Sequence, residues 1–235
     1  MIAVILSGGL GTRLHPLTTD TPKPMLPING IPHLEYQINL LKSHGFSDIV
    51  FSTGYLHSQI KDYFKDGSDH GVTIRYKEDG DTLLGTAGAL KNVFDMLDEE
   101  EVLVLNGDIL TNINLTEMKK RFVKQMNPIM IALATAEDPS QYGVAVLNKL
   151  GDKVSEFIEK PTDNKYGNLI NAGIYMMLRP VINMIPEGFS MIEKTVFPEY
   201  AKAGMLGGYT SDFYWIDIGT HERYVQVQED ARKYF

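Results

Sequence analysis

The stretch Ile2-Ala-Val-Ile-Leu-Ser-Gly-Gly-Leu-Gly-Thr-Arg-Leu14 decides the fold of this chain of 235 residues. Its first part, residues 2–6, is a short apolar run that predicts a buried β-strand. The three glycines that follow within four positions leave the backbone free to turn sharply and to approach a ligand closely. Successive backbone N–H groups in such a loop can converge on an anion. We therefore interpret the glycine loop (residues 8–11) as an anion-binding site.

Two basic residues follow the glycine loop and extend this interpretation. Arg13 carries a planar, permanently charged fork that suits phosphate oxygens, and Lys23 lies between two prolines that stiffen the chain. The loop is not the dinucleotide fingerprint, which needs a glycine where Leu14 stands, nor a Walker loop, which ends in Gly-Lys-Ser/Thr. The loop alone could be a tight turn after an edge strand, but the two cations favour a polyphosphate site.

Composition limits the class of protein. The length allows one α/β domain, and 43% hydrophobic residues suffice for a buried core. A net charge of -8 and a pI of about 5.2 argue against a nucleic-acid or anionic-membrane partner. The absence of Cys excludes disulfides and thiolate chemistry and is consistent with a cytoplasmic protein. The apolar start is too short for a signal peptide, and no run is long enough to span a membrane.

Strands and helices alternate in the first half of the chain, which predicts a parallel, doubly wound sheet. The second half is richer in strands, and a capping box of Ser190 and Glu193 predicts a helix that ends at Gly204. A last helix is expected after Gly219. The expected strands are 2–6, 48–53, 72–77, 101–106, 129–135, 143–147, 154–160, 170–178 and 213–216, and the other expected helices are 32–44, 57–64, 86–97 and 116–126.

Two segments, Ser7-Gly-Gly-Leu-Gly-Thr-Arg-Leu-His-Pro-Leu-Thr18 and Pro22-Lys-Pro-Met-Leu-Pro27, resemble the signature of the sugar-1-phosphate nucleotidyltransferases, or sugar-nucleotide pyrophosphorylases. The resemblance implies a Rossmann-like α/β fold, with a mostly parallel sheet flanked by helices and mixed strands in the C-terminal half, as in GT-A-like nucleotide-diphospho-sugar transferases. It implies one catalytic domain over residues 1–235, with a nucleotide-binding half at roughly 1–127 and a sugar-binding half at 128–235. Hexapeptide repeats are absent from the sequence, so we expect no C-terminal left-handed β-helix.

The resemblance also implies the catalytic residues, which are Arg13, Lys23 and Asp108. Asp108 and Asp217 both follow expected strands, where ligands of open α/β sheets bind, and the resemblance makes them the ligands of Mg²⁺. Mg²⁺ prefers hard oxygen ligands and often needs only one or two carboxylates beside phosphate oxygens. Taken singly, Asp108 could be a turn residue of the Asn-Gly-Asp sequence and Asp217 a helix cap.

The segment Leu84-Gly-Thr-Ala-Gly88 resembles the base-reading segment of mannose-1-phosphate guanylyltransferases. Those enzymes usually carry Glu-Pro just before it, where this chain has Asp81-Thr-Leu83. From residue chemistry alone the segment could equally be a glycine-rich helix start. The nucleotide contacts that the resemblance implies are Leu6, Ser7, Gly8, Gly9, Gly11, Thr12, Gly85, Thr86, Asn106 and Gly107.

A second set of residues matches the segments of the family that contact the sugar phosphate. The resemblance gives Glu159 to the sugar hydroxyls and Lys160 to the phosphate, for which a compact ammonium charge is suited. It adds Gly143 and Asn171 as sugar contacts, since an amide can both donate and accept. Lys194 is either a further site residue or a surface lysine.

The resemblance is greatest to guanylyltransferases that act on mannose 1-phosphate or D-glycero-D-manno-heptose 1-phosphate. We therefore expect a Mg²⁺-dependent, in-line transfer of GMP from GTP to a sugar 1-phosphate, with release of pyrophosphate. Two alternatives stay open, namely a uridylyl or other nucleotidyl enzyme for another sugar, and a non-catalytic subunit that binds nucleotide sugars. The expected partners are the nucleoside triphosphate and the sugar 1-phosphate, without nucleic acid or membrane, in a cytoplasmic monomer or small homo-oligomer.

Overall fold

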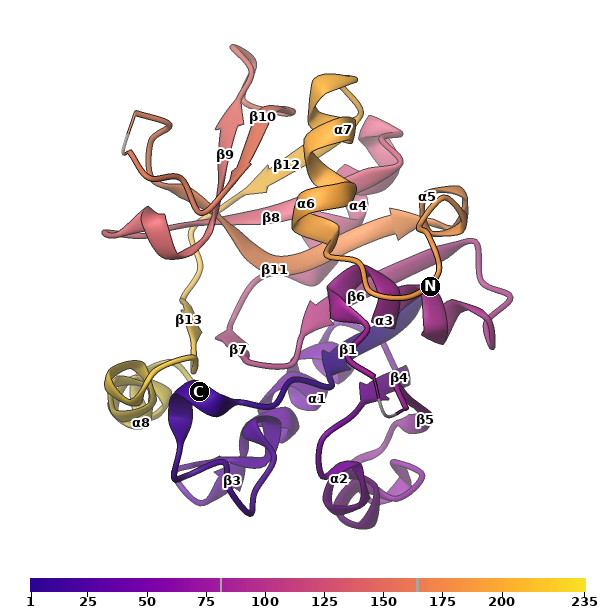
Figure 1. Ribbon diagram of the computed structural model, residues 1–235, viewed down its shortest axis with the longest axis vertical. Helices are drawn as coiled ribbons and strands as arrows, with labels where there is room; N and C mark the ends of the chain where they lie inside the picture. The colour runs from indigo at the N-terminus through magenta and orange to yellow at the C-terminus, as the bar shows by residue number, and fades with distance from the viewer. Residues whose placement is uncertain (81, 164) are drawn as a thin grey trace. The chain divides into compact units, whose positions relative to one another are not determined.

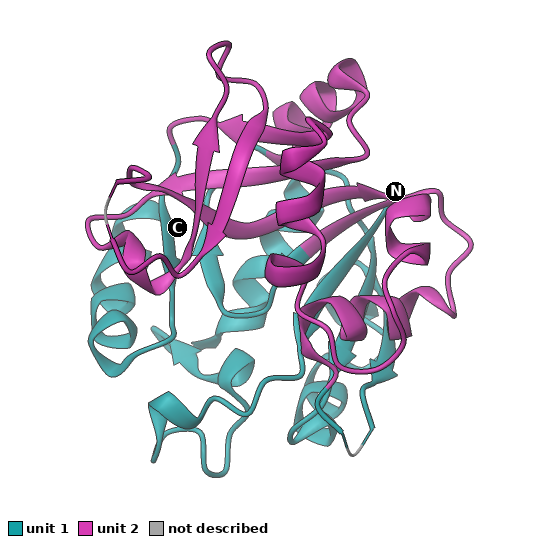
Figure 2. Ribbon diagram, turned by 45° about the horizontal axis from the view of Figure 1, so that its top comes forward, with its two compact units in different colours: residues 1–83, 105–114, 213–235 teal, residues 84–104, 115–212 magenta. Residues whose placement is uncertain are grey.

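The computed structural model in Figure 1 describes residues 1–80, 82–163 and 165–235. The chain forms two compact units, which Figure 2 distinguishes by colour. The first unit contains residues 1–83, 105–114 and 213–235, and the second contains residues 84–104 and 115–212. Strand β6 (Glu101–Asn106) begins in the second unit and ends in the first.

The first unit contains three parallel strands, hydrogen-bonded in the order β1 (Ile2–Ser7), β4 (Asp48–Thr53) and β5 (Thr73–Glu78). Ala3 is paired with Ile49, and Thr53 with Glu78, so all three strands end at the same edge. This parallel arrangement was predicted from the alternation of strands and helices. Two short antiparallel pairs complete its strands: β2 (Pro27–Ile28) with β3 (Ile31–Pro32), and β7 (Ile109–Thr111) with β13 (Trp215–Asp217).

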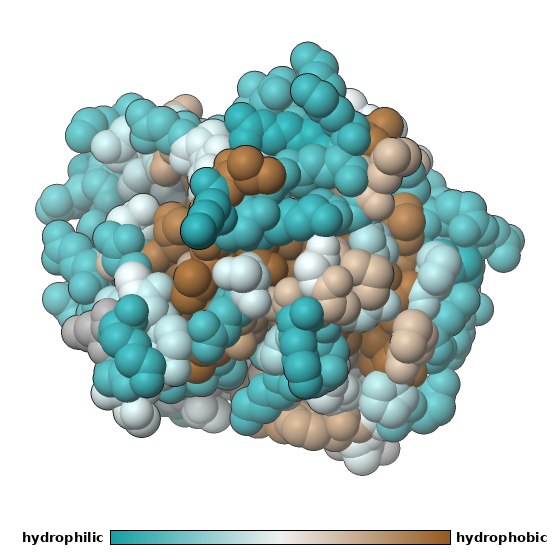
Figure 3. Space-filling view, turned by 90° about the horizontal axis from the view of Figure 1, so that it is seen from above, coloured by the Kyte–Doolittle hydropathy of each residue, from teal (hydrophilic) through white to brown (hydrophobic). Residues whose placement is uncertain are grey.

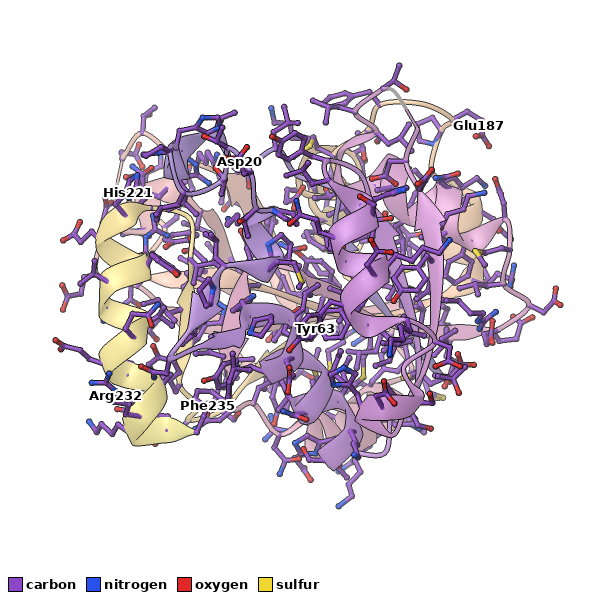
Figure 4. All side chains as sticks on the ribbon, turned by 90° about the horizontal axis from the view of Figure 1, so that it is seen from below. Asp20, Tyr63, Glu187, His221, Arg232 and Phe235 are labelled. Atoms are coloured by element: carbon purple, nitrogen blue, oxygen red, sulfur yellow. The ribbon has the colours of Figure 1, made fainter. Side chains whose placement is uncertain are left out.

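The helices of the first unit are α1 (His33–Ser43), α2 (His57–Phe64) and α8 (His221–Tyr234). The predicted apolar face of α1 is correct, because Leu34, Ile38 and Leu41 are fully buried. Figure 4 shows α8 running from His221 at its start to Arg232 in its last turn. The imidazole Nε2 of His221 lies 2.9 Å from the carbonyl oxygen of His15, so the start of α8 is fixed to the segment after the glycine loop.

The second unit is built around β11 (Leu169–Leu178), which is antiparallel to both β8 (Ile129–Thr135) and β9 (Gly143–Leu147). Strand β10 (Val154–Glu159) pairs antiparallel with β9, and β12 (Leu206–Thr210) pairs parallel with β8. The second unit therefore has the mixed strands expected for the C-terminal half, and the predicted α/β class is confirmed.

The helices of the second unit are α3 (Gly85–Phe94), α4 (Leu115–Gln125), α5 (Arg179–Asn183), α6 (Ile192–Thr195) and α7 (Phe197–Lys202). The ring of Phe197 lies 5.3 Å from that of Phe157 on β10 and 5.0 Å from that of Tyr175 on β11, so α7 packs on the strands through aromatic contacts.

The predicted continuous helix from Ser190 to Gly204 is wrong, because the structure has two short helices, α6 and α7, with Val196 between them. No side chain caps α6 in the way the capping box requires. The Ser190 hydroxyl lies 3.1 Å from the hydroxyl of Thr195, and the Glu193 carboxylate binds Thr86 instead of the backbone N–H of Ser190. A tertiary hydrogen bond has replaced the local one.

The face seen in Figure 3 is mainly hydrophilic, with apolar side chains scattered among polar ones. None of the described helices combines the length and the apolar character that crossing a membrane requires.

Candidate active site

The glycine loop follows directly from β1 and is anchored to its neighbours. The Ser7 hydroxyl donates to the carbonyl of Ser52 at 2.7 Å, and the N–H of Gly107 donates to the carbonyl of Leu6 at 2.8 Å. A Cβ atom at Gly107 would lie 2.8 Å from that same carbonyl oxygen, so a larger residue cannot take its place without displacing the backbone. Leu6, Ser7 and Gly107 therefore fix the start of the loop, while their contact with a nucleotide stays a prediction.

Gly11 ends the loop in a left-handed conformation, with φ of 66°, and precedes a 3₁₀ turn, Thr12–Leu14. The Thr18 hydroxyl donates to the Gly11 carbonyl at 2.8 Å. A Cβ at Gly11 would come within 3.1 Å of the Lys23 Cβ, so Lys23 is packed against this end of the loop. The two predicted basic residues, Arg13 and Lys23, both flank Gly11.

Lys23 and Asp108 form an ion pair, with 2.6 Å between the Lys23 Nζ and Asp108 Oδ2 atoms. The Lys23 side chain is only 12% exposed. Burial raises the pKa of Asp108, but the charge and hydrogen bond of Lys23 lower it, and the pKa lies below its usual value of 3.8. Arg13 is another positive charge that lowers this pKa. Asp108 is therefore ionised at neutral pH and is surrounded by cations.

Asp217 lies beside Asp108, because the Ile218 N–H donates to the Asp108 carbonyl at 2.9 Å. The Asp217 carboxylate accepts a hydrogen bond from the Gly219 N–H at 2.8 Å and forms an ion pair with Arg223 at the start of α8. A Cβ at Gly219 would lie 3.3 Å from the Arg13 Nη2 atom. The structure thus brings Arg13 close to the segments that carry both predicted metal ligands.

His33 is fully buried and Asn106 is half-buried close to this site. Gln37 Nε2 donates to the carbonyls of Asn106, at 2.9 Å, and Ile109, at 2.8 Å, which fixes the turn that carries Asp108. The Asn106 Oδ1 atom and both ring nitrogens of His33 have no hydrogen-bond partner among the described residues. Burial lowers the pKa of His33 from 6.5 to about 4, so the imidazole is neutral at pH 7.

The chemistry of the first unit's carboxylates fits Mg²⁺. Asp108 and Asp217 offer hard oxygen ligands, and Mg²⁺ often takes only one or two carboxylates together with phosphate oxygens and waters. Within the described residues, no three His, Asp or Glu side chains form a metal-binding group, so the protein alone does not complete a coordination shell. Phosphate oxygens and waters would supply the missing ligands.

The segment Leu84–Gly88 in the second unit is packed tightly against residues 188–192. Gly85 has φ of 70°, and a Cβ on it would lie 2.5 Å from the Ser190 carbonyl oxygen. That oxygen accepts hydrogen bonds from the Ala87 and Gly88 N–H groups, at 2.9 and 3.2 Å. The residue Asp81, which opens the segment 81–83 just before, lies outside the described residues.

The Thr86 hydroxyl is fully engaged within the second unit. It donates to Glu193 Oε2 at 2.7 Å and accepts from the Ile192 N–H at 2.9 Å. Glu193 is 8% exposed, and its burial raises the pKa of the carboxyl above 4.5. Thr86 and Gly85 therefore have a packing role in this structure, and their contact with a nucleotide stays a prediction.

Gly143 and Glu159 are paired residues on β9 and β10. A Cβ at Gly143 would lie 2.3 Å from the Phe157 ring and 2.9 Å from Glu159 Oε2, so only glycine leaves these side chains in place. Glu159 Oε2 is buried without a hydrogen-bond partner among the described residues. Burial, followed by the charge of Glu193, raises the pKa of Glu159 above 4.5.

Lys160 and Asn171 complete the predicted sugar-phosphate residues. Lys160 follows β10 with a left-handed φ of 49°, and its N–H donates to the Tyr142 carbonyl at 3.0 Å. Asn171 lies where β11 departs from regular pairing; its Oδ1 accepts from the Gly173 N–H at 2.9 Å, and its Nδ2 donates to the Tyr175 hydroxyl at 3.0 Å. These bonds orient the Asn171 amide, and its sugar contact stays a prediction.

The sequence reasoning missed four polar residues that the fold places at these sites: Asp79, His33, Arg223 and Glu193. One of them carried a usable signal, because Asp79 directly follows β5, at the carboxyl end of a parallel strand where ligands of α/β sheets bind. Glu193 reaches Thr86 through a contact between residues 107 apart in the chain, for which the local sequence gives no sign.

A family model for the nucleotidyl transferases matches residues 2–234, and the chain belongs to this family. The chain is 35% identical over 231 residues to a mannose-1-phosphate guanylyltransferase of Mycobacterium tuberculosis, covering 97% of this chain and 64% of that relative. It is 34% identical over 236 residues to a D-glycero-alpha-D-manno-heptose 1-phosphate guanylyltransferase of Aneurinibacillus thermoaerophilus, covering 100% of both. A UTP–glucose-1-phosphate uridylyltransferase of Synechocystis is 35% identical over 242 residues, covering 97% of this chain and 62% of that relative.

Among solved structures, HddC from Yersinia pseudotuberculosis complexed with GMP-PN is similar to this chain, with a TM-score of 0.81 and 27% identity. The match covers 97% of this chain and 98% of that chain. The comparisons confirm the predicted family and its fold.

Proposed function

We propose that this chain, as a member of the nucleotidyl transferase family, transfers GMP from GTP to mannose 1-phosphate or to a manno-heptose 1-phosphate. The observation that carries the proposal is the Lys23–Asp108 ion pair, which lies against the glycine loop and beside Arg13. The base and the sugar are taken from the names of the relatives in Mycobacterium tuberculosis and Aneurinibacillus thermoaerophilus.

In the proposed reaction an oxygen of the sugar phosphate attacks the α-phosphorus of GTP in line. The new P–O bond joins the two phosphates of the nucleotide sugar, and the bond between the α- and β-phosphates breaks to release pyrophosphate. Arg13 and the N–H groups of the glycine loop hold the leaving pyrophosphate. Lys23 offsets the negative charge that builds around the α-phosphate, since catalysis of such transfers is mainly positioning and charge stabilisation.

Asp108 and Asp217 are the residues that would hold Mg²⁺. The ion would neutralise phosphate charge and orient the reacting oxygens. Both carboxylates are now paired with cationic side chains, Lys23 and Arg223. Before the substrate binds, the ion pair with Asp108 keeps the Lys23 side chain oriented. If Mg²⁺ took the place of Lys23 beside Asp108, the Lys23 ammonium would become available to a phosphate oxygen.

The second unit would bind the sugar 1-phosphate. The buried Glu159 Oε2 atom has no described partner, and a sugar hydroxyl would satisfy it. Gly143 lets the Phe157 ring and Glu159 keep their positions, Lys160 offers a charge to the phosphate, and Asn171 presents an amide already oriented by two hydrogen bonds. The oligomeric state and the cytoplasmic location stay predictions.

Product analysis tests the proposal. Purified protein would be incubated with GTP, Mg²⁺ and either mannose 1-phosphate or the heptose 1-phosphate, and the products separated by ion-exchange chromatography and identified by mass. The proposal predicts a GDP-sugar and pyrophosphate in equal amounts. Hydrolysis of GTP to GDP and phosphate, without a nucleotide sugar, would contradict it.

A second candidate keeps the reaction but changes the substrates. The similarity to a uridylyltransferase of Synechocystis supports UTP and glucose 1-phosphate as an alternative pair. A non-catalytic subunit is less consistent with the chain, because Arg13, Lys23, Asp108 and Asp217 are all present. Binding of a nucleotide sugar without turnover of any substrate pair would favour that subunit.

A further inference from the structure

The two cations of the proposed site, Arg13 and Lys23, are joined by residues 15–22, which we call the connecting segment. Most side chains of this segment are exposed or half-buried, and only those of Thr18 and Pro22 are buried. Packing in the core therefore contributes little to the position of the segment. Hydrogen bonds from neighbouring elements have the larger share, and their donors help to decide where the two cations lie.

Two such donors come from one neighbouring stretch of chain. The Tyr55 hydroxyl, in the turn between β4 and α2, donates to the Thr19 carbonyl at 2.7 Å. The Gln59 Nε2 atom, in the first turn of α2, donates to the next carbonyl, that of Asp20, at 2.8 Å. Two consecutive carbonyl groups of the connecting segment are thus bound by side chains that lie four residues apart.

The stretch that carries these donors, residues 54–59, is well anchored. A Cβ at Gly54 would lie 2.8 Å from the Gly8 carbonyl oxygen, so the turn packs directly on the first glycine of the glycine loop. Phe64 of α2 is buried, and its ring lies 5.7 Å from that of Phe51 on β4. Donors on an element fixed in this way can hold an exposed segment in one place.

The connecting segment closes on the glycine loop at Gly11, because the Thr18 hydroxyl donates to the Gly11 carbonyl at 2.8 Å. This hydrogen bond closes a loop on which Arg13 lies. Thr19, the next residue, is the one whose carbonyl accepts from Tyr55. The hydrogen bond from Tyr55 therefore fastens the closed loop to the turn between β4 and α2, and with it the position of Arg13.

We propose that Tyr55 is a positioning residue for the nucleotide step, an inference that rests on the proposed function. Its hydroxyl holds the connecting segment so that Arg13 and Lys23 meet the same polyphosphate. Tyr55 acts through Arg13, which would hold the leaving pyrophosphate, and a small displacement of such a group lowers the rate. Gln59 supports the same segment, but its side chain is exposed whereas Tyr55 is half-buried, so its contribution is smaller.

The variant Tyr55→Phe removes only the hydroxyl and tests this role. Tyr63→Phe is the matched control, because Tyr63 lies on α2 and its hydroxyl donates to Glu35 Oε2 at 3.0 Å, outside the connecting segment. The measurements are kcat/KM for GTP, the KM for the sugar 1-phosphate and the inhibition constant Ki of pyrophosphate. Circular dichroism melting would be recorded for each protein.

In Tyr55→Phe, kcat/KM for GTP should fall about three- to tenfold and the Ki of pyrophosphate should rise by a similar factor, the size expected for one hydrogen bond. The KM for the sugar 1-phosphate and the melting temperature should change little, and Tyr63→Phe should match the wild type. Gln59→Ala should act in the same direction but less. Adding Tyr55→Phe to Arg13→Ala should leave Ki unaltered, because a positioning residue has no effect once the group it positions is absent.

Wild-type values of kcat/KM and Ki in Tyr55→Phe would overturn the inference. An equal loss in Tyr63→Phe, or a further rise in Ki when Tyr55→Phe is added to Arg13→Ala, would overturn it as well.

If the wild-type protein releases no pyrophosphate with any substrate pair, the proposed function fails. The affinity for pyrophosphate in the presence of Mg²⁺ would then be compared by titration calorimetry. A loss of affinity in Tyr55→Phe that Tyr63→Phe does not share, and that disappears in the Arg13→Ala background, would support the inference alone. Equal affinities, or no binding by the wild-type protein, would overturn it too.

Discussion

The carboxylates of the two units differ in their surroundings: those of the first unit are paired with cations, and those of the second are buried. In the first unit Asp108 and Asp217 are each paired with a cationic side chain, and the Lys23 charge keeps the pKa of Asp108 low despite its burial. In the second unit burial raises the pKa of Glu159 and Glu193.

The difference indicates what each unit is suited to bind. Cation-paired carboxylates can exchange their partners when a polyphosphate and a metal ion arrive, because the total charge stays balanced. A desolvated carboxylate such as Glu159 needs hydrogen-bond donors, and sugar hydroxyls supply them. We therefore expect variants of the first unit to affect the nucleotide step and variants of the second to affect the sugar.

The largest effect is expected for Arg13→Ala. Arg13 is exposed, so its loss should cost little stability, but removal of a charged contact to the leaving pyrophosphate should raise the barrier by about 2–4 kcal/mol. Turnover should then be roughly 30- to 900-fold slower, with a smaller change in KM for the sugar 1-phosphate. Arg232→Ala, another exposed arginine of the same unit, is the control. Normal turnover in Arg13→Ala would remove Arg13 from the mechanism.

Asp217→Asn should have the next largest effect. The amide keeps an oxygen for the Gly219 N–H but loses the charge that would bind Mg²⁺, so Mg²⁺-dependent turnover should fall by about 100-fold or more. Asp108→Asn should reduce Mg²⁺-dependent turnover to a similar extent. Turnover would be measured across a Mg²⁺ titration, with circular dichroism as the check on folding. Full activity at low Mg²⁺ in either variant would exclude that residue as a ligand.

Gly143→Ala and Gly9→Ala form a pair across the two units. The new Cβ at position 143 would overlap the Phe157 ring and crowd Glu159, so we expect a loss of about 1–3 kcal/mol in unfolding free energy and a higher KM for the sugar 1-phosphate. The Cβ at position 9 meets no described atom within 4 Å, so stability should change by less than about 0.5 kcal/mol. Urea denaturation and initial rates measure both, and a stable Gly143→Ala with unchanged KM would contradict the assignment.

The smallest expected effect is the pH-dependent change in stability caused by Glu193→Gln. A carboxyl whose pKa is raised in the folded state binds more protons there than when unfolded. Its contribution to stability is therefore lost as pH rises from 4.5 toward the raised pKa. Gln does not titrate and can still accept from Thr86, so Glu193→Gln should be more stable at pH 7, by up to about 1 kcal/mol. Urea denaturation from pH 4.5 to 8 measures this gain, and a gain that does not change with pH would argue against a raised pKa.

The sequence predicted the first unit better than the second, and physical reasons explain this. The glycine loop, Arg13 and Lys23 lie within 16 residues, so one local motif was enough to place them together. The predicted Ser190–Gly204 helix is divided at Val196, because Pro198 lies in the first turn of a new helix, α7. Its capping box was wrongly predicted because Glu193 bonds Thr86, 107 residues earlier in the chain. Side-chain contacts of that range depend on the tertiary fold, which a capping pattern does not include.

Pyrophosphate release is the measurement that tests the central claim most directly. The purified protein would be assayed with Mg²⁺ and a matrix of GTP, UTP, ATP and dTTP against mannose, heptose and glucose 1-phosphates. The account predicts release with GTP and a manno-configured sugar 1-phosphate, and none when the sugar phosphate is omitted. Release confined to UTP or dTTP would contradict the assignment of the base. If a folded protein released no pyrophosphate with any pair of substrates, the result would contradict the proposed reaction.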